Sequence, residues 1–256
     1  MPIYWLTEEN DQFPPAELAS AEGILAIGGD LSPERLLMAY SKGIFPWFNE
    51  GEPIAWWSPD PRMVLFPSEL KVSKSMRPYF NQAKFTVSFD QNFRGVVSNC
   101  QSPRSNQFGG TWITNDILEA YSHLHELGFA HSVEVWNGQE LVGGLYGIAL
   151  GKCFFGESMF AKASNASKFG FIYLVKTLEA LGFWLIDCQQ QTQHLNSMGA
   201  RPIRRLDFLK ILEKNLQQET LHGNWGGLAN AMQPAFAQFL KEKLPFSQRK
   251  KVNSAI

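Results

Sequence analysis

From Arg62 onward, short apolar runs alternate with longer stretches in which apolar residues recur at helical spacing. The runs are rich in β-branched and aromatic residues, which favours strands at 63–66, 85–89, 131–136, 140–150, 153–160 and 184–188. Asn137-Gly138 predicts a tight hairpin between two of these strands. Amphipathic patterns predict helices at 73–82, 92–100, 115–127, 164–181 and 205–215. This order predicts an α+β domain with a mostly antiparallel centre.

The first sixty or so residues are instead rich in Pro, Gly and Trp, which predicts a small irregular lobe ending near Pro61. Within it, Ser32-Pro33 is a good helix start, and a helix is expected over 34–42. The pattern weakens after Glu219, where a helix could occupy 228–243 before a basic tail. The predicted organisation is therefore an N-terminal domain (1–61), a larger α+β domain (62–218) and a C-terminal extension (219–256).

Composition narrows the class of protein. The chain has 256 residues, of which 45% are hydrophobic and 18% charged, as expected for a globular protein. The net charge of -1 does not by itself indicate a nucleic-acid binder, although a local basic patch can be hidden in a balanced total. MPIYWLTEEN carries acids where a secretory signal would carry lysines, and charges interrupt the most apolar stretch, 170–186. Neither a signal peptide nor a membrane-spanning helix is predicted.

Cysteine and histidine usage argues against metal and disulfide chemistry. The 3 cysteines are far apart and form no CxxC, and the 5 histidines form no HExxH. We therefore expect no metal, no disulfide framework and a reducing, cytoplasmic location.

The common cofactor motifs are also absent from the sequence. There is no GxGxxG, no GxxxxGK[ST] and no GxSxG, so dinucleotide, P-loop and hydrolase-elbow chemistry is not indicated. The order of helices and strands resembles the acetyltransferase superfamily, but that family's pyrophosphate loop, Q/R-x-x-G-x-G/A, is missing. Coenzyme A therefore has no obvious cradle, and no cofactor is expected.

A more specific resemblance comes from a series of blocks that occur in order between about Gly23 and Arg205. They are GGDLSPERLLMAYSKGIFPWF, WWSPDPR, GTWIT, AYSHLHELGFAHSVEVW, LVGGLYG, FFGESMF, NASK and LIDCQ. These blocks resemble the leucyl/phenylalanyl-tRNA--protein transferase family. The resemblance implies a small N-terminal lobe followed by an N-acyltransferase-like (GNAT-like) domain, with aminoacyl-tRNA in place of acyl-CoA.

The implied activity transfers Leu or Phe, and Met less well, from aminoacyl-tRNA to proteins that begin with Arg or Lys, which marks them for N-degron degradation. An aminoacyl ester is already activated, so the enzyme mainly has to align amine and ester, without ATP or metal. Where LIDCQ matches the family, Asp187 is the expected anchor or base for the acceptor amine, and Gln189 is expected to orient substrate. For an arbitrary Asp at a strand end, capping of the next turn would be the preferred interpretation.

The aminoacyl pocket should be apolar and should offer a polar partner for the free α-amine. The candidate residues for it are Phe154, Gly156, Glu157, Ser158, Met159, Leu145 and Leu174. Glu157 is the polar partner, since it is a charge amid apolar neighbours. Strict strand alternation would place Phe155, Glu157 and Met159 on one face and Phe154, Gly156, Ser158 and Phe160 on the other, with Phe155 and Phe160 in the core. Leu145 stands where the family commonly has Met, a change that conserves volume.

The single-stranded 3′ end of tRNA is usually held by aromatic stacking and by basic side chains. Trp47 and Trp112 lie in matched blocks and are candidate walls for the terminal adenosine or aminoacyl group, although a structural role is equally compatible with each. Lys74, Arg77 and Lys84 lie where the family has a basic cluster for the acceptor stem. Pro78 interrupts that segment, which argues against one shared helical face.

Two other functions remain compatible with these residues. One is an acyl-CoA-dependent N-acyltransferase on the same scaffold, which the missing pyrophosphate loop disfavours. The other is a non-catalytic adaptor that binds charged tRNA and leaves the amino acid on it. Transfer of labelled Leu from intact tRNA to a protein beginning with Arg would separate all three.

Overall fold

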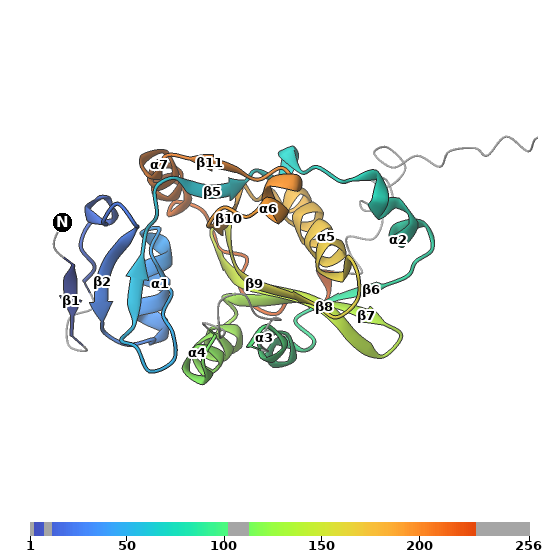
Figure 1. Cartoon of the computed structure of the whole chain (residues 1–256), viewed down its shortest axis with the longest axis horizontal. Coiled ribbons are helices and arrows are strands. Elements are labelled where there is room, and N and C mark those ends of the chain that lie inside the picture. The colour runs from blue at the N-terminus through green and yellow to red at the C-terminus, as the bar shows by residue number, and fades with distance from the viewer. Residues whose placement is uncertain (1–2, 8–11, 102–112, 229–256) are drawn as a thin grey trace, which may run out of the picture.

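The computed structural model describes residues 3–7, 12–101 and 113–228. Figure 1 shows a smaller N-terminal lobe beside a larger one built around a curved sheet. The larger sheet has seven strands in the order β11-β5-β10-β9-β8-β7-β6. Its strands are β5 (Arg62–Leu65), β6 (Thr86–Phe89), β7 (Ala130–Asn137), β8 (Glu140–Leu150), β9 (Cys153–Ala161), β10 (Leu185–Gln189) and β11 (Arg201–Ile203).

Neighbouring strands of this sheet are antiparallel except for β9 and β10. The parallel pair is joined by α5 (Ala166–Ala180), the crossover that such a pair requires. The α+β class and the mostly antiparallel centre expected from the sequence are thereby confirmed. The Asn137-Gly138 hairpin is confirmed as well, because β7 and β8 pair up to Asn137 and Glu140.

Helices cover both faces of the sheet (Figure 1). The helices α3 (Phe93–Gln101) and α4 (Asn115–Glu126) lie on one face, and α5 lies on the other. The α5 helix approaches the strands closely because Gly170 faces Val135: a Cβ at Gly170 would come within 2.7 Å of the valine Cγ2 atom. The apolar face of α5 thus packs directly on the sheet, and Leu174 and Leu178 are almost fully buried there.

The N-terminal lobe contains a second sheet, which corrects the expectation of an irregular lobe. Its four strands run in the order β1-β2-β4-β3, and they are β1 (Tyr4–Leu6), β2 (Ile24–Gly28), β3 (Phe45–Pro46) and β4 (Ala55–Trp57). These strands are too short for a period-2 pattern to be visible in the sequence. The helix α1 (Pro33–Ser41) begins after Ser32 as expected.

The remaining helices are short or follow the main sheet. They are the 3₁₀ turns Ala16–Leu18, Pro67–Glu69 and Lys74–Met76, and the α-helices α2 (Arg77–Asn81), α6 (Gln193–Ser197) and α7 (Arg205–Asn215). The continuous helix predicted over 73–82 is wrong, because it is split into a 3₁₀ turn and α2. Pro78 causes the split, since proline is accommodated only in the first turn of a helix.

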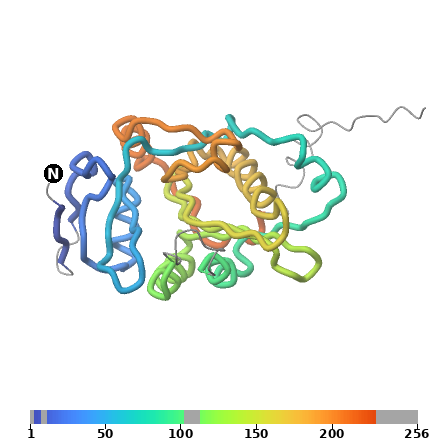
Figure 2. The backbone as a smooth tube through the Cα atoms, viewed as in Figure 1, coloured from blue at the N-terminus to red at the C-terminus, as the bar shows by residue number. Residues whose placement is uncertain are grey.

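The two lobes share one core. Phe208 and Leu212 of α7 pack with Leu36 and Tyr40 of α1 in the same buried cluster. Figure 2 shows this return of the chain, with the orange tube of α7 beside the N-terminal lobe. The chain passes from the N-terminal sheet to the main sheet between Trp57 and Arg62. The domain boundaries expected at 61 and 218 stay predictions. The helix predicted over 228–243 lies outside the described residues, apart from its first residue.

Within the described ranges, no helix is both long and apolar enough to cross a bilayer.

Candidate active site

A cavity of about 880 Å³ opens between the lobes, over the strands β8, β9 and β10. Its inner wall is apolar and includes Leu145, Phe154, Phe171, Leu174 and Ile186. Its polar lining includes Glu157, Asp187 and Gln189, which lie on β9 and β10. The cavity therefore combines an apolar interior with a small group of polar side chains, as small-molecule sites usually do.

A β-bulge at Glu157 orients this carboxylate. Tyr146 pairs with Ser158, but the next residue of β8, Gly147, pairs with Gly156, so Glu157 is the extra residue on β9. Bulges of this kind redirect a side chain and are frequent beside active sites. The strict alternation expected along 154–160 is wrong for this reason: Ser158 shares a face with Tyr146, while Gly156 shares the opposite face with Gly147.

The Glu157 carboxylate is held by groups from three other elements. Tyr40 of α1 donates a hydrogen bond to Oε1 at 2.7 Å, and Tyr121 of α4 donates to Oε2 at 3.2 Å. The Gln189 side chain of β10 donates to Oε1 at 2.8 Å. The two tyrosine hydroxyls also lie within hydrogen-bond distance of each other, so their two protons are shared among three contacts. A carboxylate fixed in this way at the cavity can bind a cation.

Burial raises the pKa of Glu157 from 4.5 to about 7. The hydrogen bond from Tyr40 opposes this rise in pKa, and the nearby negative charge of Asp187 adds to it. Burial likewise raises the pKa of Tyr40 and of Tyr121 well above 10, so both hydroxyls stay protonated donors. Glu157 therefore titrates near neutral pH, where a functional group is most useful.

Asp187 is fully buried in an ion pair with Arg62 of β5. The guanidinium Nε lies 2.8 Å from Oδ1 and Nη2 lies 2.6 Å from Oδ2, a bidentate geometry. Arg62 also donates to the Gly43 carbonyl at 3.1 Å and packs between the rings of Phe45 and Phe208. Removing two charges from water is costly, and this pair offsets the cost with several hydrogen bonds.

Gln189 is placed by a second bulge. The pairing of β10 with β5 shifts between Asp187 and Gln189, and Gln189 has a φ of 59°, in the left-handed region. Its backbone N–H donates to Asp187 Oδ1 at 2.9 Å. A non-glycine residue in this conformation costs roughly 1–3 kcal/mol, and such strain is found mainly at functional sites. Asp187 thus holds the backbone whose side chain contacts Glu157.

The sequence matches two family models and many curated relatives. Residues 64–213 match the model described as leucyl/phenylalanyl-tRNA protein transferase, and residues 29–60 match that of its N-terminal domain. A protein named leucyl/phenylalanyl-tRNA--protein transferase from Pseudomonas fluorescens (strain SBW25) is 54% identical over 225 residues, which cover 87% of this chain and 99% of the relative. The Christiangramia forsetii protein of the same name is 59% identical, over 82% of this chain and 100% of the relative.

The chain belongs to the leucyl/phenylalanyl-tRNA--protein transferase family. The family recognised from the sequence blocks is thereby confirmed.

Two solved structures align with this member of the leucyl/phenylalanyl-tRNA--protein transferase family at low identity. The GCN5-related N-acetyltransferase from Kribbella flavida aligns with a TM-score of 0.33 and 9% identity, over 69% of this chain and 63% of that one. The L-PGS structure from Bacillus licheniformis aligns with a TM-score of 0.39 and 11% identity, over 76% of this chain and 72% of that one.

The cavity brings together the pocket residues expected from the leucyl/phenylalanyl-tRNA--protein transferase resemblance. Its lining includes Trp47, Leu145, Phe154, Gly156, Glu157, Ser158, Met159, Leu174, Asp187 and Gln189. Phe155 and Phe160 lie in the core as expected. Trp112 lies outside the described residues. The roles of these residues stay predictions, because their position alone does not test them.

The expected tRNA-binding residues lie in one stretch of chain but not in one helix. Lys74 is exposed in a 3₁₀ turn, Arg77 is half-buried at the start of α2, and Lys84 is exposed after that helix. The Lys84 ammonium lies 5.0 Å from the centre of the Tyr79 ring. These basic residues do not share one helical face.

Sequence reasoning missed the residues that support the site. Tyr40, Tyr121 and Arg62 all lie in blocks matched to the leucyl/phenylalanyl-tRNA--protein transferase family, but each occurs far along the chain from its acidic partner. The signal in the sequence that could have pointed to these residues was their position in the matched blocks. The spacing of residues along the chain gives no indication of contacts between distant segments. Among the described residues, no group of three or more His, Cys, Asp or Glu side chains could hold a metal.

Proposed function

We propose that this protein transfers leucine or phenylalanine, and methionine less efficiently, from aminoacyl-tRNA to the N-terminal Arg or Lys of acceptor proteins. The observation that carries the proposal is the position of the Glu157 carboxylate beside an apolar cavity, in a chain of this family. A leucyl or phenylalanyl ester carries an apolar side chain and a free α-ammonium group on the same α-carbon. The cavity offers a matching pair of environments.

The donor side chain is assigned to the apolar wall formed by Leu145, Phe154, Met159 and Leu174. These apolar side chains offer no strong hydrogen-bonding group to a polar amino acid. Among apolar amino acids, the fit of the side chain to the pocket alone discriminates by roughly 1–3 kcal/mol per methylene. Met159 is only half-buried and is flexible, which supports acceptance of both Leu and Phe. The donor α-ammonium is assigned to Glu157.

The reaction forms one bond and breaks one bond at the ester carbonyl. The neutral N-terminal amine of the acceptor attacks the carbonyl carbon, an amide C–N bond forms, and the C–O bond to the tRNA ribose breaks. The amine loses a proton and the departing ribose oxygen gains one. An α-amine has a pKa of about 7.7–8.0, so part of it is neutral at pH 7 and the enzyme mainly has to align the reactants.

Asp187 and Gln189 are assigned to that alignment. Both oxygens of Asp187 are already bound by Arg62, so direct binding of the acceptor amine would compete with a bidentate ion pair. We therefore assign Asp187 to fixing Gln189, whose side chain contacts substrate together with Glu157. This assignment favours positioning over proton acceptance for Asp187.

The tRNA is assigned to Trp47 and Trp112 for its terminal nucleotide and to Lys74, Arg77 and Lys84 for its acceptor stem. Trp47 lines the cavity and is half-buried, which leaves ring surface for stacking. The choice of acceptors beginning with Arg or Lys, and their subsequent degradation, rests on the family resemblance. Aminoacyl-tRNA is made in the cytoplasm, which supports a cytoplasmic location.

The proposal is tested by following labelled leucine from charged tRNA to protein. Purified protein is incubated with labelled Leu-tRNA and matched acceptors that begin with Arg, Lys or Ala, with and without ribonuclease pretreatment. Label should move to the Arg and Lys acceptors only when the tRNA is intact. Turnover of acyl-CoA without tRNA would instead identify an N-acyltransferase, and binding of charged tRNA without transfer would identify an adaptor.

A further inference from the structure

The chain after α7 forms a strap (residues 216–228) across the end of the main sheet. It is anchored at successive turns: Thr220 Oγ1 accepts from Gly151 N at 2.8 Å, and Gly223 N donates to the Gly128 carbonyl at 3.1 Å. The strap lies beyond residues 64–213, the part matched by the family model. No residue of the strap lines the cavity.

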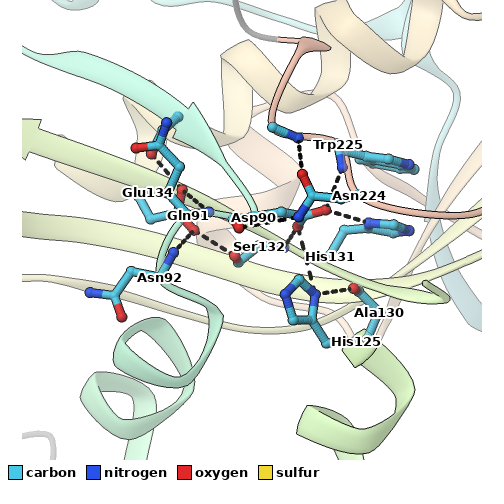
Figure 3. Close-up of polar contacts among 12 residues, drawn as sticks. Asp90, Gln91, Asn92, His125, Ala130, His131, Ser132, Glu134, Asn224 and Trp225 are labelled. Atoms are coloured by element: carbon cyan, nitrogen blue, oxygen red, sulfur yellow. Dashed lines mark hydrogen bonds and ion pairs between the residues drawn. The ribbon is translucent and has the colours of Figure 1, made fainter. Parts of the chain in front are cut away.

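Near its end the strap carries a buried tryptophan, Trp225, that is fixed on several sides. Trp225 is 2% exposed, and its backbone N–H donates to Asp90 Oδ2 at 2.7 Å. Its ring stacks on His131, with ring centres 3.7 Å apart and an interplanar angle of 7°. Figure 3 shows the rings of Trp225 and His131 lying parallel beside Asp90.

Asp90 ties this arrangement to the sheet. Its carboxylate pairs with His131 Nδ1 at 2.9 Å and accepts from the Ser132 backbone N–H at 2.8 Å (Figure 3). The other ring nitrogen of His131, Nε2, is buried without a hydrogen-bond partner among the described residues. Burial lowers the pKa of His131, so its ring stays neutral and can stack on Trp225.

Trp225 also contacts the wall of the cavity. Its ring centre lies 6.2 Å from that of Phe154, which is 1% exposed and lines the apolar interior. Phe154 has little freedom elsewhere, because its ring packs over Gly147: a Cβ there would come within 2.6 Å of the phenylalanine Cε1 atom. Gly147 and Trp225, which both contact the Phe154 ring, therefore fix the position of this part of the cavity wall.

We infer that Trp225 is a specificity-determining positioning residue of the donor pocket, acting through Phe154. The inference deepens the proposed function and rests on it for the identity of the donor. Removing part of the indole would let Phe154 move back and would deepen the pocket. A larger donor side chain should then gain relative to a smaller one.

The test is Trp225→Phe, assayed with Leu-tRNA and Phe-tRNA competing in one reaction. A competition ratio does not depend on how much of the protein is folded, so a merely structural role would leave it unchanged. We expect the ratio of phenylalanine to leucine transferred to rise by about threefold or more, which is less than the roughly 10–200-fold of a methylene that contacts the substrate directly, because Trp225 acts through Phe154. Trp225→Tyr should give a smaller shift in the same direction and serves if Trp225→Phe does not fold.

Trp56→Phe is the matched control. Trp56 is also a buried tryptophan whose indole N–H donates to a backbone carbonyl, but it lies in the N-terminal lobe and does not line the cavity. An unchanged ratio in Trp225→Phe, or an equal shift in Trp56→Phe, would overturn the inference.

A binding measurement separates this inference from the proposed function. Leucyl- and phenylalanyl-adenosine amides, which cannot transfer their amino acid, are titrated into the wild type and Trp225→Phe. The ratio of their affinities should shift as the transfer ratio does. If the wild type binds both amides but transfers nothing, the proposed function fails while the binding ratio still decides the role of Trp225.

Discussion

Glu157 combines two requirements that oppose each other at the scale of one residue. It must be enclosed enough to recognise an ammonium group without competing water, yet enclosure favours its neutral form. Tyr40, Tyr121 and Gln189 resolve the conflict in part, since each donates a hydrogen bond that stabilises the ionised form. The outcome is a carboxyl group whose pKa is about 7.

The first prediction concerns stability against pH. A carboxyl whose folded pKa is raised from 4.5 to about 7 binds its proton more tightly in the folded state. Its contribution to the free energy of unfolding is therefore largest below the unfolded pKa and falls as pH rises towards the folded one. Glu157→Gln should remove this dependence. Urea unfolding of both proteins at about pH 5 and about pH 8 measures it, and parallel pH dependences would contradict the raised pKa.

The second prediction concerns the ion pair of Arg62 and Asp187. Arg62→Met leaves a buried carboxylate without its counter-ion, which should lower the free energy of unfolding by about 3–5 kcal/mol. The double variant Arg62→Met, Asp187→Leu replaces both charges and should recover most of that loss. Urea unfolding gives the comparison.

The same double variant separates structure from catalysis. If Asp187 fixes Gln189, the stable double variant should still transfer leucine about 100-fold more slowly than the wild type, because a misplaced aligning group costs that much. Near-normal transfer would instead assign Asp187 to folding alone.

At the scale of elements, the site depends on irregularities in two neighbouring strands. Bulges at Glu157 of β9 and before Gln189 of β10 turn both side chains towards each other, although the strands are otherwise regular and parallel. Regular strands would place their side chains alternately on the two faces. The site thus lies where the sheet departs from its own geometry.

The sequence predicted the elements far better than these departures. Strong periodicity located α5, the Asn137-Gly138 pair located the hairpin of β7 and β8, and the family blocks drew attention to Glu157, Asp187 and Gln189. A bulge leaves no mark in a hydrophobic pattern, so the faces assigned to Ser158 and Phe160 relative to Phe154 were wrong. The supporting contacts could not be predicted either, because that of Tyr40 depends on how the lobes pack and that of Arg62 depends on the strand order that places β5 beside β10.

The third prediction concerns the close contact of β8 and β9. A Cβ at Gly147 would lie 2.2 Å from the Phe155 carbonyl oxygen and 2.6 Å from the Phe154 ring. Gly147→Ala should therefore lower the free energy of unfolding by about 1–3 kcal/mol through overpacking. Gly227→Ala is the control, since nothing lies within 4 Å of a Cβ there. Equal unfolding midpoints for the two variants would show that the contact relaxes freely.

At the scale of the whole molecule, the chain closes on itself. After forming the main sheet it returns through α7 to the N-terminal lobe, where Phe208 packs within 3.0 Å of the Cβ position of Gly43. The Phe208 ring also lies 4.7 Å from the Arg62 guanidinium, which pairs with Asp187. The packing between lobes thus continues into the hydrogen bonds that hold Gln189.

The last prediction follows from this shared core: the two lobes unfold together. Phe208 is fully buried, so Phe208→Ala should cost about 3–5 kcal/mol and should weaken both lobes equally. Native-state hydrogen exchange measures each lobe through its own amides, with β2 and β4 reporting on the N-terminal lobe and β8 and β9 on the other. Because the buried cluster spans both lobes, the most protected amides of each should report the same opening free energy, before and after the substitution. Earlier opening of β2 and β4 alone in Phe208→Ala would mean that the lobes are separately stable units, and that α7 only rests on the first of them.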